Sequence, residues 1–198
     1  MQPSGIVRRH FLKSTLGLAV GFVWAPELLS QISAVDLPPG SLINNRMLDS
    51  WIHIEPEGKV TVLAGKVEFG QGITTALMQI VADELEIDLL RISMIPTTTG
   101  ISPNEGVTSG SQSIEYGGIA LRYAAADAKK VLLEQAATKL NVQASELQVR
   151  NGIIRTPAGQ EVSYWDLANQ SLLQKPVSTN VLLNTTHSVI GKSIKRLD

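Results

Sequence analysis

The stretch Gly65–Leu85 reads GKVEFGQGITTALMQIVADEL and joins a glycine-containing loop to an apolar repeat. Apolar side chains recur in it at three- and four-residue spacings, at Ile73, Leu77, Ile80, Val81 and Leu85. This spacing places one apolar stripe along a helix from about Gly72 to Glu86. The stretch therefore predicts a helix that packs on a core and is entered through a glycine turn.

Strands and a second helix are predicted around this helix. Residues 51–55 alternate in polarity, residues 56–59 read as a turn, and residues 60–64 are rich in β-branched side chains, so that together they predict a hairpin. Residues 91–95 alternate again and predict a further strand. An alanine-rich stretch at about residues 117–140 predicts a second long helix.

The last predicted elements are short. Residues 147–154 and 161–164 flank Pro157-Ala158-Gly159 and are expected to form one hairpin. Ser163 and Asp166, three residues apart, match a capping box at the start of a short helix. The predicted fold class is therefore α+β, built of hairpins and two main helices.

Composition limits the classes of function. The chain has 198 residues, is 43% hydrophobic, carries a net charge of −1 and contains no cysteine. One folded core is expected from this length, which we place at residues 48–170. Without cysteine the chain can hold no disulfide, no thiolate nucleophile and no iron-sulfur cluster of its own. The near-zero charge lacks the basic excess that nucleic acid binding requires, so nucleic acid is not expected as a partner.

The amino-terminal segment differs from the rest of the chain in its charge and apolar pattern. Arg8, Arg9 and Lys13 precede a short apolar run, and no acidic residue occurs before Glu27. The sequence RRHFLK resembles a twin-arginine export signal, which predicts a signal at residues 1–34 and a periplasmic location, associated with the inner membrane. A Sec-type signal or an ordinary amphipathic start is the alternative. Whether the signal is cleaved stays open.

A second glycine-containing loop, residues 106–113, reads GVTSGSQS and also precedes a predicted helix. The first backbone N–H groups of a helix have no partner within the helix, so both loops lead into places that attract anions. Serine, threonine and glutamine side chains add neutral donors and acceptors. The loops are therefore predicted to bind one large anionic ligand. The alternative is that Gly70 and Gly72 only make a tight turn and that residues 108–113 only cap a helix.

These two loops resemble one known family. The pattern Glu-x-Gly-Gln-Gly-x-x-Thr-x-x-x-Gln, present at residues 68–79, is similar to a segment of the xanthine dehydrogenase and aldehyde oxidase molybdenum subunits. The pattern Thr-x-x-Ser-x-Ser, present at residues 108–113, is similar to the stretch by which that family holds its pterin cofactor. Within the family, the chain most resembles the amino-terminal part of the isoquinoline 1-oxidoreductase beta subunits and of related aldehyde or nicotinate dehydrogenases.

The resemblance implies a cofactor site. The implied cofactor is molybdenum-molybdopterin, in its cytosine dinucleotide form, with the metal held by pterin sulfurs and not by side chains. Gln71 would hydrogen-bond the pterin region, and Gly70 and Gly72 would let the loop approach it. The pterin and the phosphates would be cradled by the second loop, through Thr108, Ser109, Gly110, Ser111, Gln112 and Ser113. No catalytic residue is expected in this chain.

Glu68 and the three histidines are not expected to have a catalytic or metal-binding role. Glu68 is tempting as a general base, but it lies in the cofactor loop, and the family's base belongs to a different, later motif; a structural role is expected for it. His10, His53 and His187 are isolated in the sequence and show no metal-ligand spacing. No side-chain metal site is therefore predicted.

The family also implies an activity and partners. The whole assembly would oxidise an aldehyde or an N-heterocycle with oxygen from water, and electrons would leave through an iron-sulfur subunit and a cytochrome c. Residues 190–198 resemble the opening of the family's hammerhead domain, so residues 171–198 are expected to be a linker towards it. We expect another chain to supply the remaining molybdenum-subunit segments, unless this chain is a truncated remnant. The alternative is a non-catalytic assembly module that binds a partner chain without cofactor.

Overall fold

The computed structural model describes residues 37–197. The predicted export signal therefore lies outside the described residues. The folded unit begins at Pro38, earlier than predicted. A 3₁₀ turn η1 (Gly40–Ile43) buries Ser41 and Leu42, so most of the predicted linker at residues 35–47 belongs to the folded unit. The cause is packing, since Leu42 joins the core although no local periodicity marks it.

The first sheet has the order β1-β2-β3. Strands β1 (Ile52–Glu55) and β2 (Lys59–Val62) form the antiparallel hairpin that the sequence predicts, with Ile52 opposite Val62. Strand β3 (Ile92–Met94) pairs with β2 in parallel, with Val60 opposite Ile92. A parallel pair needs a crossover connection, and the predicted helix provides it between β2 and β3.

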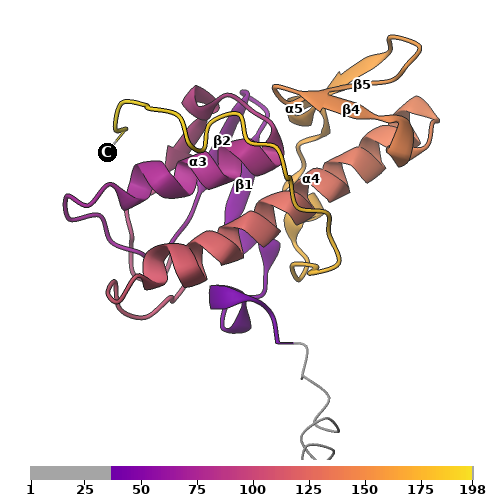
Figure 1. Ribbon diagram of the computed structural model, residues 1–198. Helices are drawn as coiled ribbons and strands as arrows, with labels where there is room; N and C mark the ends of the chain where they lie inside the picture. The colour runs from indigo at the N-terminus through magenta and orange to yellow at the C-terminus, as the bar shows by residue number, and fades with distance from the viewer. Residues whose placement is uncertain (1–36, 198) are drawn as a thin grey trace, which may run out of the picture. The chain divides into compact units, whose positions relative to one another are not determined.

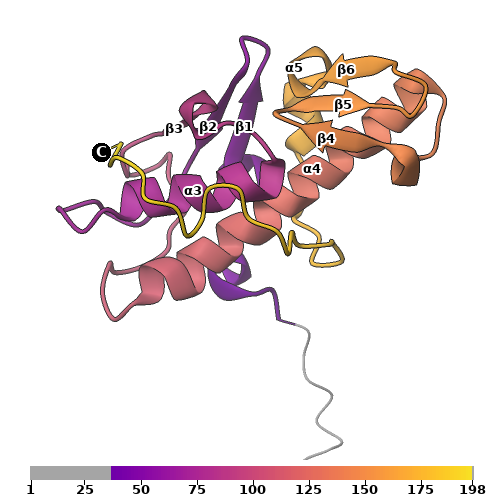
Figure 2. The same ribbon diagram turned by 45° about the horizontal axis from the view of Figure 1, so that its top comes forward.

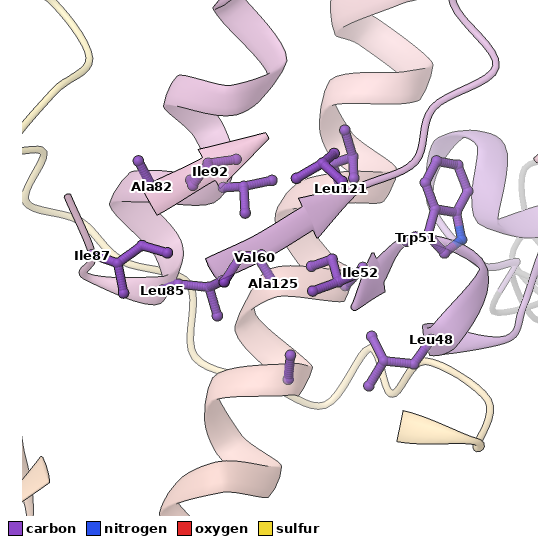
Figure 3. Close-up of a cluster of buried hydrophobic side chains, with 14 of the residues drawn as sticks. Leu48, Trp51, Ile52, Val60, Ala82, Leu85, Ile87, Ile92, Leu121 and Ala125 are labelled. Carbon is purple, nitrogen blue, oxygen red and sulfur yellow. The ribbon is translucent and has the colours of Figure 1, made fainter. Parts of the chain in front are cut away.

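This crossover helix is α3 (Ile73–Leu85), as predicted, and it packs against the long helix α4 (Ile119–Leu140). Figure 3 shows the core between helices and strands, where Val60 and Ile92 lie close to Leu85 and Ala82. Fully burying one such aliphatic side chain contributes about 1.5 to 3 kcal/mol. The apolar stripe of α3 is therefore what fixes this helix on the sheet, and the loop that precedes it is held in place with it.

Helix α4 begins differently from the prediction. A π-helical segment η4 (Ser113–Gly118) precedes it, and its glycines Gly117 and Gly118 are buried. An added Cβ at Gly117 would lie 2.6 Å from Oε1 of Glu105, and one at Gly118 would lie 3.0 Å from Ile80. The two glycines therefore allow the start of α4 to approach its neighbours closely. π-Helical turns of this kind occur often at functional sites.

The second sheet has the order β4-β5-β6 and corrects one prediction. Residues 147–154 are not one strand, because β4 (Gln148–Arg150) and β5 (Ile153–Arg155) are joined by a turn at Asn151-Gly152, both with positive φ. The dipeptide Asn-Gly is a strong signal for such a turn, and the apolar pattern around it hid the signal. Strand β6 (Glu161–Ser163) leads into α5 (Tyr164–Leu167), whose predicted capping box of Ser163 and Asp166 is confirmed.

The carboxyl-terminal segment after η6 (Gln170–Leu173) was predicted to be a linker, but it is packed on the domain through hydrogen bonds to α3 and α4. Up to residue 197 it contains no helix or strand, and it runs back along α3, as the yellow trace in Figures 1 and 2 shows. The α+β class is confirmed. Within residues 37–197, no helix is long and apolar enough to cross a membrane.

Candidate functional site

The two predicted loops meet in the structure. We call residues 65–72 loop A and residues 106–113 loop B. Loop A enters α3 and loop B enters η4 and α4, and because these helices pack together, both loops lie at the same end of the helix pair (Figure 2). The backbone N–H of Val67 donates a hydrogen bond to Oγ1 of Thr108, at 2.9 Å. Residues 41 positions apart in sequence thus form one surface.

A buried lysine forms a second link between the loops. Lys66 is only 1% exposed, and its Nζ donates hydrogen bonds to the backbone carbonyl oxygens of Glu105 and Val107, at 2.8 and 3.0 Å. A buried ammonium is costly unless it is hydrogen-bonded. Lys66 therefore fixes the path of the chain that leads into loop B.

The side chain of Glu105 completes this link. Its Oε2 accepts from the N–H of Gly65 at 2.6 Å and its Oε1 accepts from the hydroxyl of Ser41 at 2.8 Å. Burial raises the pKa of Glu105 above its usual range, against the opposing effects of these two hydrogen bonds and of the charge of Lys66. An added Cβ at Gly65 would lie 2.1 Å from the carbonyl oxygen of Pro103, so glycine is required there.

Glu68 organises loop A from within. Its Oε1 accepts from the N–H groups of Gly70 and Gly72, at 2.8 and 3.0 Å, and its Oε2 accepts from the N–H of Thr74, at 3.0 Å. A carboxylate at a helix amino terminus is stabilised by the unpaired N–H groups and by the helix dipole. Glu68 therefore has the expected structural role. It also occupies the start of α3, where the sequence predicted a place for an external anion.

The side chain of Gln71 is also engaged in loop A. Its Oε1 accepts from the N–H of Phe69 and its Nε2 donates to the carbonyl oxygen of Val67, both at 2.8 Å. Each end of the amide keeps one further hydrogen-bonding position, since an amide NH₂ has two protons and the oxygen two lone pairs. The predicted contact of Gln71 with a pterin stays a prediction, and it can only use these remaining positions.

Loop B has a more open geometry. Gly106, Gly110 and Ser111 have φ of 67°, 59° and 64°, and the space that a Cβ would enter at Gly106 and Gly110 is empty to 4 Å. Serine in the left-handed region is strained. Ser109, Gly110 and Ser111 are all exposed. Between Thr108 and Ser113 no acidic side chain occurs. Loop B therefore presents hydroxyl, amide and backbone groups without negative charge.

Exposed apolar side chains surround the loops. Phe69 of loop A is 69% exposed and Val107 of loop B is 68% exposed, and Val67, Ile114 and Tyr116 are exposed beside them. We call these five side chains the apolar rim. Exposed apolar side chains grouped in one region indicate a surface that another molecule or chain segment covers.

Other candidate positions do not join the site. His53 is exposed and contacts the backbone oxygen of Asp49, and Nδ1 of His187 lies 3.5 Å from Oδ2 of Asp83, on the far part of α3. His10 lies outside the described residues. Within residues 37–197, no group of three or more metal-ligating side chains is assembled. A groove of about 780 Å³ lies elsewhere, over α4 and β4, and it includes no residue of either loop.

Sequence reasoning found both loops but missed what joins them. Lys66 stands inside the quoted stretch and Glu105 directly precedes loop B, yet charged residues beside glycine loops read as solvent-exposed. Their burial follows from the packing of Ser41, Gly65 and Gly117 around them, which is not local in sequence. The one sequence signal for this link was that a lysine and a glutamate, which can form an ion pair, each stand in or beside one of the two predicted ligand loops.

Comparison with known proteins identifies the family. The family model described as "Molybdopterin cofactor-binding domain" matches residues 13–191. The chain is 30% identical to a subunit of the nicotinate dehydrogenase of Pseudomonas putida, over 79% of this chain and 13% of that protein. It is also 30% identical to a membrane-bound aldehyde dehydrogenase (pyrroloquinoline-quinone) of Gluconacetobacter polyoxogenes, over 84% of this chain and 21% of that protein. Human aldehyde oxidase is 32% identical over 42% of this chain and 6% of its own length.

Solved structures agree with this assignment. A copper- and molybdenum-containing CO dehydrogenase superposes with a TM-score of 0.53 and 30% identity, covering 59% of this chain and 15% of that chain. Quinoline 2-oxidoreductase from Pseudomonas putida 86, at 22% identity and a TM-score of 0.50, shares the fold. The chain thus spans a small fraction of the length of the proteins that it matches. It belongs to the molybdopterin cofactor-binding domain family, within the xanthine dehydrogenase and aldehyde oxidase group.

Proposed function

We propose that loops A and B together hold the molybdenum-molybdopterin cofactor of an oxidoreductase. The observation that carries the proposal is the hydrogen bond from the Val67 N–H to Thr108, which joins the two loops into one surface. Family membership supports the cofactor, and the meeting of loops that lie 41 residues apart supports a shared ligand in preference to two separate helix caps.

The residues of loop B fit such a ligand. Gly106 and Gly110 leave open space at the position of a Cβ, so a bulky ligand can approach the backbone there. Ser109, Ser111 and Ser113 supply neutral donors, which suit both phosphate oxygens and the polar edge of a pterin. Loop A fits less completely, because Glu68 already binds the N–H groups at the start of α3. The anionic part of the cofactor is therefore assigned to loop B.

The division of roles follows from this. Loop B holds the phosphates of a cytosine dinucleotide form through Thr108, Ser109, Gly110, Ser111, Gln112 and Ser113. Loop A, with Gly70, Gln71 and Gly72, lies against the pterin. When bound, the cofactor supplies two-electron chemistry that inserts oxygen from water into an aldehyde or an N-heterocycle. This chain contributes binding and orientation, and no catalytic side chain.

Further protein segments complete the proposed site. The apolar rim around both loops supports a covering segment, and the matched relatives are several times longer than the region they share with this chain. We place the remaining molybdenum-subunit segments on this rim. In this proposal electrons leave through an iron-sulfur centre and then a cytochrome c, and the centre is placed on a separate subunit because this sequence has no cysteine to hold a cluster.

The location of the assembly is part of the proposal. Arg8 and Arg9 support export through the twin-arginine route, which carries folded proteins and so permits cofactor insertion before export. Replacing both arginines with lysine is expected to keep the protein in the cytoplasm, measured by cell fractionation. Lys13→Arg is the matched control and is expected to be exported. Normal periplasmic delivery of the double lysine variant would contradict the twin-arginine assignment.

The cofactor proposal is tested on the full chain purified with its partners. Molybdenum is measured by mass spectrometry, and the nucleotide released by acid is identified by chromatography. We expect about one molybdenum and one cytidine nucleotide per chain. A pterin without cytidine would overturn the dinucleotide form alone. An assembled complex without molybdenum or pterin would overturn the proposal and leave the non-catalytic assembly module as the function.

A further inference from the structure

The carboxyl-terminal segment is fastened to α3 at both ends of the helix. We call residues 184–197 the strap. At the carboxyl end of α3, the side chain of Asn184 donates to the backbone oxygen of Asp83 at 2.6 Å, and the N–H of Asn184 donates to Oε2 of Glu84 at 3.0 Å. Glu84 is buried and also accepts from Nε of Arg122 at 2.6 Å. The strap thus starts from a buried polar anchor.

Asp83 is the main fastening of the strap. Its buried carboxylate accepts from three consecutive backbone N–H groups, those of Ser188, Val189 and Ile190, at 2.7, 2.8 and 2.9 Å, and from the hydroxyl of Ser188 at 2.8 Å. Burial acts to raise the pKa of Asp83, but these hydrogen bonds outweigh it and the pKa lies below its usual value. Asp83 is therefore held as an anion by the strap itself.

The other end of the strap reaches loop A. The N–H of Leu197 donates to Oγ1 of Thr75, at 2.9 Å, in the first turn of α3. Nη1 of Arg196 donates to the carbonyl oxygen of Gly70 at 2.9 Å, and its Nη2 lies 3.5 Å from Oε1 of Glu68. The strap therefore runs the length of α3, from Asp83 to the loop, in agreement with its course in Figure 1.

Through Arg196, the strap contacts Glu68, the residue that organises loop A. Oε1 of Glu68 holds the N–H groups of Gly70 and Gly72, and Arg196 contacts both this carboxylate oxygen and the carbonyl oxygen of Gly70. Gly70 has a φ of 107° and nothing within 4 Å of the position of a Cβ, so no neighbour crowds it on that side. Its position is set by hydrogen bonds, and one of these comes from the strap.

We infer that Arg196 is a positioning residue for loop A, delivered to the loop by the strap. Its guanidinium contacts the carbonyl of Gly70 through Nη1 and the carboxylate of Glu68 through Nη2, so that one rigid planar group holds both. The inference deepens the proposed function and rests on it, because it makes the geometry of the proposed cofactor loop depend on a segment 126 residues away in sequence.

The first arm of the test measures the loop directly. Hydrogen exchange of a peptide covering residues 66–74 is followed by mass spectrometry in the purified full-length assembly. Arg196→Ala is expected to speed this exchange about two- to tenfold, the factor that corresponds to the loss of one or two ordinary hydrogen bonds. Arg196→Lys is expected to fall between, and Lys195→Ala, which removes an exposed charge one position away, is expected to match the wild type. Unchanged exchange in Arg196→Ala would overturn the inference.

The second arm connects the loop to the ligand. Molybdenum content per chain is expected to fall at least about twofold in Arg196→Ala and to stay at the wild-type level in Lys195→Ala. Full molybdenum content together with a faster loop would overturn the positioning role. If the wild type itself holds no molybdenum, the proposed function fails, while the exchange comparison still decides whether the strap holds the loop.

A variant at the carboxyl end of α3 tests whether the strap as a whole, and not the Arg196 side chain alone, positions loop A. Asp83→Asn removes the acceptor charge of the main fastening without touching loop A. It is expected to raise exchange in residues 66–74 as well as in the strap. Faster exchange in the strap alone would show that the two ends act independently and would contradict delivery of Arg196 by the strap.

Discussion

The hydroxyl of Thr108 accepts a hydrogen bond from the backbone N–H of Val67, at 2.9 Å, and so joins two glycine loops that lie far apart in sequence. Next to Val67 in sequence, Lys66 donates a hydrogen bond to the carbonyl oxygen of Val107 at 3.0 Å. A backbone-lined surface made of two chain segments keeps its shape only if the segments are fixed to each other. These two contacts fix them, one exposed and one buried.

Thr108→Val tests the exposed contact. The substitution keeps the shape of the side chain and removes the acceptor for Val67, so the free energy of unfolding is expected to fall by about 0.5 to 1.5 kcal/mol. Urea unfolding of the purified assembly measures it. Thr108→Ser keeps the hydroxyl and is the control. A loss in Thr108→Ser with none in Thr108→Val would show that the methyl group, and not the hydrogen bond, joins the loops.

Lys66→Met tests the buried contact and is expected to have a larger effect. It leaves the carbonyl oxygens of Glu105 and Val107 without their donor and leaves the carboxylate of Glu105 without a nearby positive charge. Each unsatisfied buried group costs about 1 to 3 kcal/mol. Lys59→Met, at an exposed position of β2, is the matched control. A loss no greater than that of the control would contradict the anchoring role.

Ser111 allows backbone strain to be separated from ligand contact. Its φ of 64° is unfavourable for serine, so Ser111→Gly is expected to stabilise the folded chain by about 1 kcal/mol, while Ser111→Ala is not. Both variants lack the hydroxyl. If the hydroxyl binds the cofactor, both lose part of the molybdenum content. A destabilised Ser111→Gly variant would contradict the strained geometry.

The sequence predicted the elements well where one local signal dominated. The apolar stripe from Ile73 to Leu85 indicated α3, and the pair Ser163 and Asp166 indicated the capping box. The turn at Asn151-Gly152 was overlooked because apolar residues on both sides read as one strand. A local pattern therefore predicts an element correctly when no second pattern in the same stretch indicates a different structure.

The cofactor contacts of the two loops stay predictions, and the contacts that join and position the loops were not predicted. Both loops were found from their glycines, and loop B also from its hydroxyl residues, but the roles of Lys66 and Arg196 depend on contacts with residues 39 and 126 positions away. The strap has no periodicity, because it is held by backbone N–H groups that bind Asp83 and not by an apolar face. Polar anchoring of irregular segments leaves no repeat in a sequence.

The fastening of the strap predicts a pH dependence. The pKa of Asp83 lies below its ordinary value of 3.8, so below about pH 5 the unfolded chain binds more protons than the folded chain. The stabilisation that ionised Asp83 provides is therefore complete at neutral pH and is lost as the pH falls through the folded-state pKa. The difference in unfolding free energy between wild type and Asp83→Asn is expected to shrink over this range. A difference that stays constant from about pH 6 to about pH 3 would contradict the assignment.

The central claim, that the open backbone of loop B holds the cofactor, is tested most directly by molybdenum and acid-released cytidine nucleotide per assembled complex in Gly110→Val. The matched control is Gly159→Val in the turn between β5 and β6, because both glycines have positive φ and nothing within 4 Å of the position of a Cβ. Valine therefore introduces the same kind of backbone strain at both positions, but only Gly110 lies in the proposed site. We expect the Gly110 variant to lose most of both components while the Gly159 variant keeps them. Full cofactor content in an assembled Gly110→Val complex would contradict the claim.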